Sequence, residues 1–123
     1  ETRTAAILAK AVAQDAAALD AFEALRAATL GGAKAMGFDH LVGSIEPGKQ
    51  ADLALVDLSA LETQPLHHVV SQLVYATGRH QVTDVWIAGR ARLRDRELVD
   101  MDPDRIVANA HQWRERIAAV ERS

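Results

Sequence analysis

The sequence contains no cysteine, and aromatic residues make up only 4% of its 123 residues. Without cysteine, the chain has no disulfides, thiolate metal ligands or cysteine nucleophiles, and its composition suits a reducing cytoplasm, where we expect the protein. No apolar run reaches the roughly 20 residues that span a bilayer. The net charge of -3 gives no electrostatic reason to bind nucleic acid. We therefore expect neither a membrane nor a nucleic-acid partner.

The composition is otherwise that of a globular protein. Hydrophobic residues make up 49% of the chain and charged residues 25%, which suits one domain or part of a larger one. The core must be built from alanine, leucine, valine and isoleucine. The first residues, Glu1–Thr4, include neither an initiator methionine nor the apolar region of a signal peptide. A helical pattern is already running there, so we expect an element upstream of this chain.

Two helices are predicted in the first part of the chain. Apolar residues recur at helical spacing between Thr2 and Val12. After a polar break, Asp20 followed by Glu23 three residues later resembles a capping box, which predicts a second helix start. We expect the Gly31–Gly32 pair to interrupt this second helix, and a last short turn to end at Gly37.

A sharply punctuated segment follows. Glu46–Lys49 contains Pro-Gly at its centre and predicts a type II turn, because proline fixes φ at the second position and glycine accepts positive φ at the third. The run from Asp52 to Leu58 is apolar at both parities between its aspartates. This pattern predicts a strand that is central in its sheet or covered on both faces.

The second half predicts a short helix, a hairpin and a long helix. The helix covers His67–Thr77 and is expected to end at Gly78. Strand Val82–Ala88 then turns at Ala88–Gly89, tightly or through a longer loop, and Arg90–Leu98 returns as its partner strand. Asp102-Pro103 predicts the start of the final helix, whose apolar residues recur at 3–4 spacing: Ile106, Val107, Ala110, Trp113, Ile117 and Val120.

Residues that could carry chemistry are present singly and do not combine. The five histidines have neither His-x-His nor HExxH spacing: His40, His67, His68, His80 and His111. Asp52 and Asp57 are five residues apart, so on a strand they face opposite sides and are expected to flank its ends. Ser44 and Ser71 lack the G-x-S-x-G context of a nucleophile. We assign no catalytic, cofactor-binding or metal-binding residue to this chain.

Alternating arginines form a further pattern. Arg90, Arg92, Arg94 and Arg96 would share one face of a single strand. A nucleic-acid stripe is one interpretation. A solvated outer face is the favoured one, because Asp95 and Glu97 lie nearby and no aromatic platform accompanies the arginines.

One long segment resembles a known family. "LRAATLGGAKAMGFDHLVGSIEPGKQADLALVDL", Leu25–Leu58, is similar to the C-terminal signature of the amidohydrolase superfamily. The matching positions are Gly43, Ser44, Ile45, Gly48, Lys49, Ala51, Asp52 and Leu53, with isoleucine in place of the usual leucine at position 45. "SQLVYATGRHQVTDVWIAGR", Ser71–Arg90, resembles the branch that contains methylthioadenosine/S-adenosylhomocysteine deaminases and chlorotriazine hydrolases. That branch usually carries Asn-Gly where this chain has Ala88–Gly89.

The resemblance implies an α/β architecture in which this chain is the C-terminal part. Residues 1–37 would be the last helices of a metal-dependent (β/α)8 barrel, residues 38–100 the C-terminal half of a small composite β-sandwich with a short helix, and residues 101–123 a closing helix. Lys49 and Asp52 would then be structural. The implied cofactor is a divalent metal, which is commonly zinc in this family. Residues upstream of this chain would bind it. The remainder of the barrel would be its covalent partner.

The resemblance also implies an activity for the intact protein. A metal-activated water would replace the amino group of an adenosine-type nucleoside, either 5′-methylthioadenosine or S-adenosylhomocysteine, and ammonia would leave. The alternatives are a dechlorinase or another heterocycle deaminase of the same superfamily, or a non-catalytic assembly module. We expect this chain to be inactive alone, and a homodimer is a further expectation from the family.

Overall fold

The computed structural model describes residues 1–120 and contains both helices and a small antiparallel sheet. The α-helices are α1 (Thr2–Ala13), α2 (Ala21–Arg26), α3 (Gly32–Ala35), α4 (Val69–Ser71) and α5 (Pro103–Val120). The strands are β1 (Leu53–Val56), β2 (Val82–Ile87), β3 (Arg90–Arg94) and β4 (Glu97–Leu98). Four short π- or 3-10-helical segments complete the fold: η1 (Ala27–Gly31), η2 (Leu61–Thr63), η3 (Gln72–Ala76) and η4 (Arg79–Gln81). The predicted mixture of helix and strand is confirmed.

The first two helices form as the sequence predicts. α1 ends at Gln14, which adopts a left-handed conformation with φ 52°. α2 begins at Asp20, whose Oδ1 accepts a hydrogen bond from Glu23 N at 2.8 Å, while Asp20 N donates to Glu23 Oε2 at 3.1 Å. This reciprocal capping box is worth about 1 kcal/mol of helix stability.

The expected interruption at Gly31–Gly32 is wrong. Both glycines have helical φ values, -63° and -62°, and α2 continues through the π-helical η1 into α3. A Cβ at Gly31 would meet the Arg26 carbonyl oxygen at 3.1 Å, so glycine fits the wider π turn without a steric conflict. The helix ends at Gly37 as predicted, with φ 76° and a hydrogen bond from Phe38 N to Ala33 O of 2.8 Å.

The four strands form one antiparallel sheet in the order β1-β2-β3-β4. β1 is therefore an edge strand, and its Leu53 and Leu55 side chains are exposed. The prediction of a central strand, or of one covered on both faces, is wrong for residues 1–120, because β1 lies at the edge of the sheet and Leu53 and Leu55 are exposed. The type II turn before β1 is confirmed: Gly48 has φ 92°, and Lys49 N donates to Glu46 O at 3.2 Å.

Two tight hairpin turns connect β2, β3 and β4. Ile87 pairs with Arg90, so Ala88–Gly89 is a two-residue turn, with φ values of 50° and 76°. Asp95 and Arg96, with φ values of 48° and 67°, make the second turn. Arg90–Leu98 is therefore two strands instead of the single predicted one. Arg96 lies in a turn, away from the other three arginines of the expected face.

The helix predicted from His67 to Thr77 is present as α4 followed by the π-helical η3. It begins at His68, whose Nδ1 accepts a hydrogen bond from Ser71 N at 3.2 Å. The helical run ends at Ala76 with Thr77 as its C-cap, so the predicted end next to Gly78 is confirmed in position. Gly78 does not adopt the left-handed conformation of a glycine stop: its φ is -107°, and it precedes η4.

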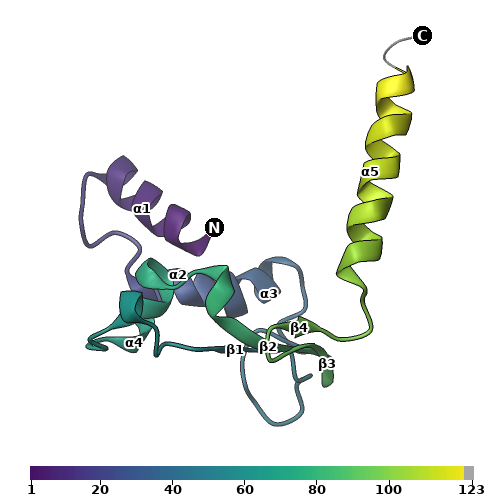
Figure 1. Cartoon of the computed structure of the whole chain (residues 1–123). Coiled ribbons are helices and arrows are strands. Elements are labelled where there is room, and N and C mark those ends of the chain that lie inside the picture. Colours follow the sequence, from purple (N-terminus) through teal and green to yellow (C-terminus); the bar gives the residue numbers. More distant parts are fainter. Residues whose placement is uncertain (121–123) are drawn as a thin grey trace.

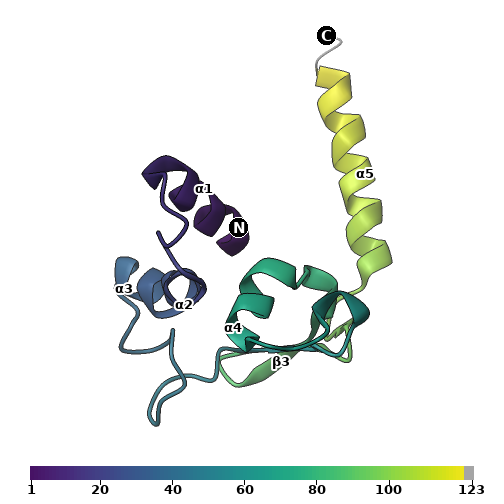
Figure 2. The same cartoon turned by 90° about the vertical axis from the view of Figure 1, so that its left-hand side faces the viewer.

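The buried core of the described chain is small and lies where α1, α2 and η3 meet. Its fully or nearly buried members are Ala6, Ala21, Ala24 and Val74. Figures 1 and 2 show these helices gathered over one end of the sheet, while α5 projects away from it on the same side as α1. Many large apolar side chains of residues 1–120 remain exposed outside this core, which is typical of a surface that packs against another part of a protein.

The start of α5 is confirmed. Asp102 Oδ1 accepts hydrogen bonds from Asp104 N at 3.0 Å and Arg105 N at 3.1 Å, and Pro103 is the first helical residue. The last three residues of the expected closing segment, 121–123, lie outside the described residues. Within residues 1–120, no helix is both long and apolar enough to cross a membrane.

Candidate functional site

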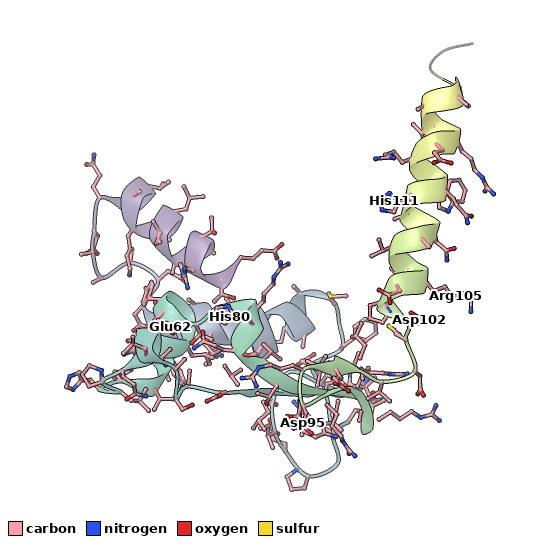
Figure 3. The ribbon with its side chains drawn as sticks, in the orientation of Figure 1. Glu62, His80, Asp95, Asp102, Arg105 and His111 are labelled. Atoms are coloured by element: carbon pink, nitrogen blue, oxygen red, sulfur yellow. The ribbon has the colours of Figure 1, made fainter. Side chains whose placement is uncertain are left out.

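The histidines do not converge. All five are exposed, and Figure 3 shows His80 on the body of the molecule and His111 on the projecting helix α5. Within residues 1–120, no group of three or more histidine and carboxylate side chains is arranged to hold a metal ion. That this chain contributes no catalytic, cofactor-binding or metal-binding residue stays a prediction.

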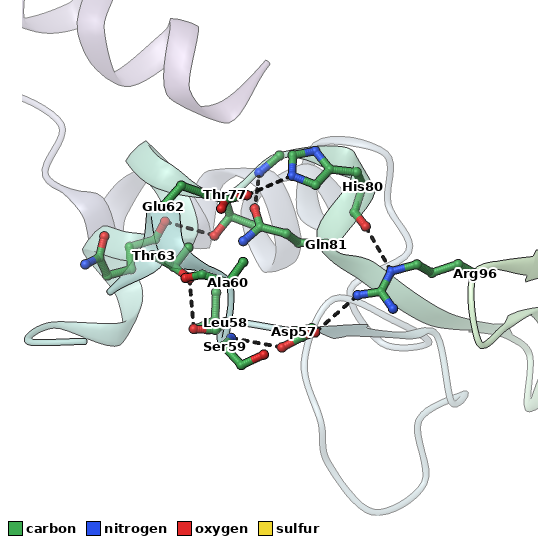
Figure 4. Close-up of polar contacts among 12 residues, drawn as sticks. Asp57, Leu58, Ser59, Ala60, Glu62, Thr63, Thr77, His80, Gln81 and Arg96 are labelled. Atoms are coloured by element: carbon green, nitrogen blue, oxygen red, sulfur yellow. Dashed lines mark hydrogen bonds and ion pairs between the residues drawn. The ribbon is translucent and has the colours of Figure 1, made fainter. Parts of the chain in front are cut away.

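A cluster of polar contacts lies between η2, η4 and the β3–β4 turn (Figure 4). His80 Nε2 lies 3.1 Å from Glu62 Oε1. The hydrogen bond with His80 is the main cause that lowers the pKa of the Glu62 carboxyl. Both side chains are at least half exposed, so this contact links two surface segments and is weak in free energy.

A second ion pair continues the cluster. Arg96 Nη2 donates to Asp57 Oδ2 at 3.2 Å, and Arg96 Nε donates to the His80 carbonyl at 3.1 Å. The pKa of Asp57 is lowered, first by hydrogen bonds from Ser59 and then by Arg96. Asp57 does lie just past the end of β1, as predicted, but its partner Arg96 was missed. The turn that brings Arg96 to it contains no glycine or proline to signal it.

Two buried polar residues hold the base of this cluster. Thr63 is fully buried, and its hydroxyl donates to the carbonyl oxygens of Leu58 and Ala60, 2.8 Å from each. Gln81 is 2% exposed, and its Oε1 accepts from Gly78 N at 2.7 Å. These bonds satisfy backbone groups of the loops that flank β1 and β2, which is a structural role.

The loop before β1 is also held by internal contacts. Lys49 Nζ donates to Ser44 Oγ at 2.6 Å and lies 3.4 Å from Glu46 Oε1. Hydrogen bonding to Ser44, followed by the charge of Lys49, lowers the pKa of Glu46. Asp52 Oδ1 accepts from Ala88 N at 2.6 Å and so fixes the hairpin turn to the start of β1. These contacts agree with the structural roles expected for Lys49 and Asp52.

An open groove runs beside β1, but it lacks a catalytic pair. Its lining is mostly apolar and includes a single carboxylate, Asp57, and no histidine. Among residues 1–120, the three carboxylates whose pKa departs from its ordinary value are all lowered. A general acid at neutral pH needs a raised carboxyl pKa, and none of these three carboxyl groups has one.

A sequence model of the amidohydrolase family matches residues 1–92. The chain belongs to this family. It is 48% identical over 119 residues to a 5-methylthioadenosine/S-adenosylhomocysteine deaminase of Teredinibacter turnerae, which corresponds to 97% of this chain and 27% of the relative. It is 41% identical over 123 residues to the protein of that name from Saccharophagus degradans, or 28% of that relative. The chain thus spans about a quarter of the length of the curated relatives it matches.

Solved structures agree with this assignment. An adenosine deaminase from Xanthomonas campestris with bound zinc superposes with a TM-score of 0.95 at 73% identity, over 97% of this chain and 27% of that one. An atrazine chlorohydrolase from Arthrobacter aurescens, complexed with zinc, superposes at 0.81 with 27% identity, over 90% of this chain and 25% of its own. The fold of the described residues is that of a segment of amidohydrolase enzymes.

Proposed function

We propose that this chain is the C-terminal part of a metal-dependent amidohydrolase that deaminates 5′-methylthioadenosine or S-adenosylhomocysteine and releases ammonia. The observation that carries the proposal is the 48% identity to a deaminase of that name over nearly the whole chain. The superposition on a zinc-containing adenosine deaminase supports the same reaction class. The bond broken is the C–N bond of the exocyclic amine, with water as the co-substrate.

Within such an enzyme, the chain would play a structural part. Residues 1–37 would close the (β/α)8 barrel, residues 38–100 would form the C-terminal half of a composite β-sandwich, and residues 101–123 would be the closing helix. The helix stop at Gly37 and the helix start at Pro103 support these boundaries. The exposed apolar side chains of β1 support a second layer over the sheet. The remainder of the barrel is the partner that this division requires.

The metal would be held outside this chain. The residues described here do not fit a metal site, because no three potential ligands among residues 1–120 come together. Zinc is the metal named with the solved relatives, and it is our proposal for the intact enzyme. The residues of this chain would form part of the scaffold of the enzyme, and we propose that the chain alone is inactive. The cytoplasmic location stays a prediction from composition.

A dechlorinase is the second candidate. It is favoured by the superposition on an atrazine chlorohydrolase. The identity to that protein is 27%, well below the 48% to the deaminase, and so the deaminase comes first. A non-catalytic assembly module is the third hypothesis. It would be consistent with the lack of a metal site among residues 1–120.

The test uses the full-length protein. Ammonia release is measured with 5′-methylthioadenosine and S-adenosylhomocysteine, and chloride release with atrazine, before and after treatment with a chelator and restoration with zinc. The proposal expects ammonia from at least one nucleoside, loss of activity on chelation, and recovery with zinc. Chloride release without ammonia would support the dechlorinase. No turnover of any of the three compounds by a zinc-loaded, folded protein would support the assembly module.

A further inference from the structure

Helix α5 carries an apolar stripe with no cover in the described chain. The stripe consists of Ile106, Val107, Ala110, Trp113 and Ile117, and its large side chains are 51–61% exposed. Arg116 lies over the Trp113 ring, 5.1 Å from its centroid, and leaves that ring largely exposed. Figures 1 and 2 both show α5 standing clear of the other helices, and it makes no substantial contact with any element of residues 1–102.

The orientation of α5 is nevertheless the same in a solved relative. α5 holds 18 of the 123 residues, about a seventh of the chain, so a helix that pointed elsewhere would hold the TM-score well below the observed 0.95. The superposition covers 97% of this chain, which must include α5. No element of residues 1–102 packs against α5 closely enough to fix its angle. Something outside the described residues therefore holds it.

Two occupants could cover the stripe: the rest of the same polypeptide, or a second copy of this chain. A stable interface between two proteins uses about 20–30 residues a side, whereas the stripe offers five. The solved relative has almost three-quarters of its chain outside the superposed region. In addition, α1 stands on the same side of the sheet as α5 (Figures 1 and 2) and exposes its own Leu8 and Val12. One body that continues from α1 can reach both helices.

We propose that the apolar stripe of α5 packs against a part of the same polypeptide that lies outside these 123 residues. This packing would hold the C-terminal helix against the catalytic part of the protein. This inference rests on the proposed function in one respect, namely that such a body exists. It adds that the stripe of α5 makes an intramolecular contact and not a contact between subunits. The burial of the stripe is then independent of protein concentration.

The test is amide hydrogen exchange over residues 103–120 of the full-length protein, followed by mass spectrometry. A packed α5 is expected to exchange at least about tenfold more slowly than an unsupported helix, because exchange then requires undocking. The protection is expected to persist over about a hundredfold dilution, since an intramolecular contact does not depend on concentration. The matched variants are Ala110→Asp, on the stripe, and Ala108→Asp, on the opposite face of the same helix.

Each outcome decides the proposal. Protection that survives dilution, is lost in A110D and is kept in A108D supports it. Protection lost on dilution, together with a fall in molecular mass, assigns the stripe to a second copy and overturns it. Absence of protection in the wild type, or equal behaviour of the two variants, also overturns it. If A110D does not fold, the wild-type dilution series decides alone. If the protein is inactive on the nucleosides but keeps this protection, the proposed function is refuted, whereas the intramolecular packing of α5 remains supported.

Discussion

Gly43 and Gly48 provide a controlled test of how the loop before β1 packs on the helical layer. Both have positive φ, 95° and 92°, so alanine is strained at either position. They differ in their surroundings. A Cβ on Gly43 would lie 2.7 Å from Ala33 Cβ and 3.0 Å from Leu30 Cα, whereas a Cβ on Gly48 would meet nothing within 4 Å.

The two substitutions should therefore differ in free energy. Gly48→Ala is expected to cost about 1–2 kcal/mol, which is the penalty for an L-residue in a left-handed conformation. Gly43→Ala pays the same penalty and adds overpacking of about 1–3 kcal/mol. The clash is with backbone and with a short side chain, neither of which can move aside without shifting the helix. The expected difference between the variants is thus about 1–3 kcal/mol, with Gly43→Ala the less stable.

The assay is thermal unfolding of the full-length protein by calorimetry, with hydrogen exchange over residues 27–36 as a local readout. Gly43→Ala is expected to unfold at a clearly lower temperature and to raise exchange in this helix. Gly48→Ala should lower the unfolding temperature less and leave the helix protected. Equal unfolding temperatures and unchanged exchange in both variants would refute the close contact between the loop and the helix.

Three further predictions concern single contacts. Ala88→Asn places a residue that tolerates positive φ before glycine and should stabilise the hairpin by up to about 1 kcal/mol, measured as a rise in unfolding temperature; a fall would contradict the turn assignment. Thr63→Val removes a buried hydroxyl that serves two carbonyl oxygens and should destabilise by about 1–3 kcal/mol, seen in urea unfolding, whereas Thr63→Ser should retain most of the stability. The pKa of Asp57 is lowered by Ser59 and Arg96, so its stabilising contribution is present above the ordinary pKa of aspartate and is lost as the pH falls through the folded value. Asp57→Asn should therefore flatten the acidic part of the stability–pH curve, and an unchanged curve would count against these contacts.

The sequence predicted the elements whose signals are local. The capping box at Asp20, the stop at Gly37, the turn at Glu46–Lys49 and the start at Asp102-Pro103 all depend on residues within four positions of one another. In each case the side chain or the φ preference acts on its own backbone. These features could therefore be predicted from residues that are close together in the sequence.

The elements that were missed depend on distant contacts. The turn at Asp95–Arg96 has positive φ at both residues, which aspartate tolerates but arginine does not favour, and it is held by Arg96, which reaches Asp57 and the His80 carbonyl. Likewise, Gly31 reads as a helix breaker unless the π turn that brings it against Arg26 O is known. For the site, the absence of catalytic residues in this chain stays a prediction, and the contacts around Asp57 could be found only from the fold.

We propose that further polypeptide covers the exposed apolar faces of this chain in the intact protein. The direct measurement is thermal unfolding of the 123-residue chain expressed alone, with an apolar dye as the reporter of exposed surface. We expect poor solubility or a broad, non-cooperative transition, with strong dye binding from the start. A monodisperse monomer that melts in one sharp transition and binds no dye would contradict the claim.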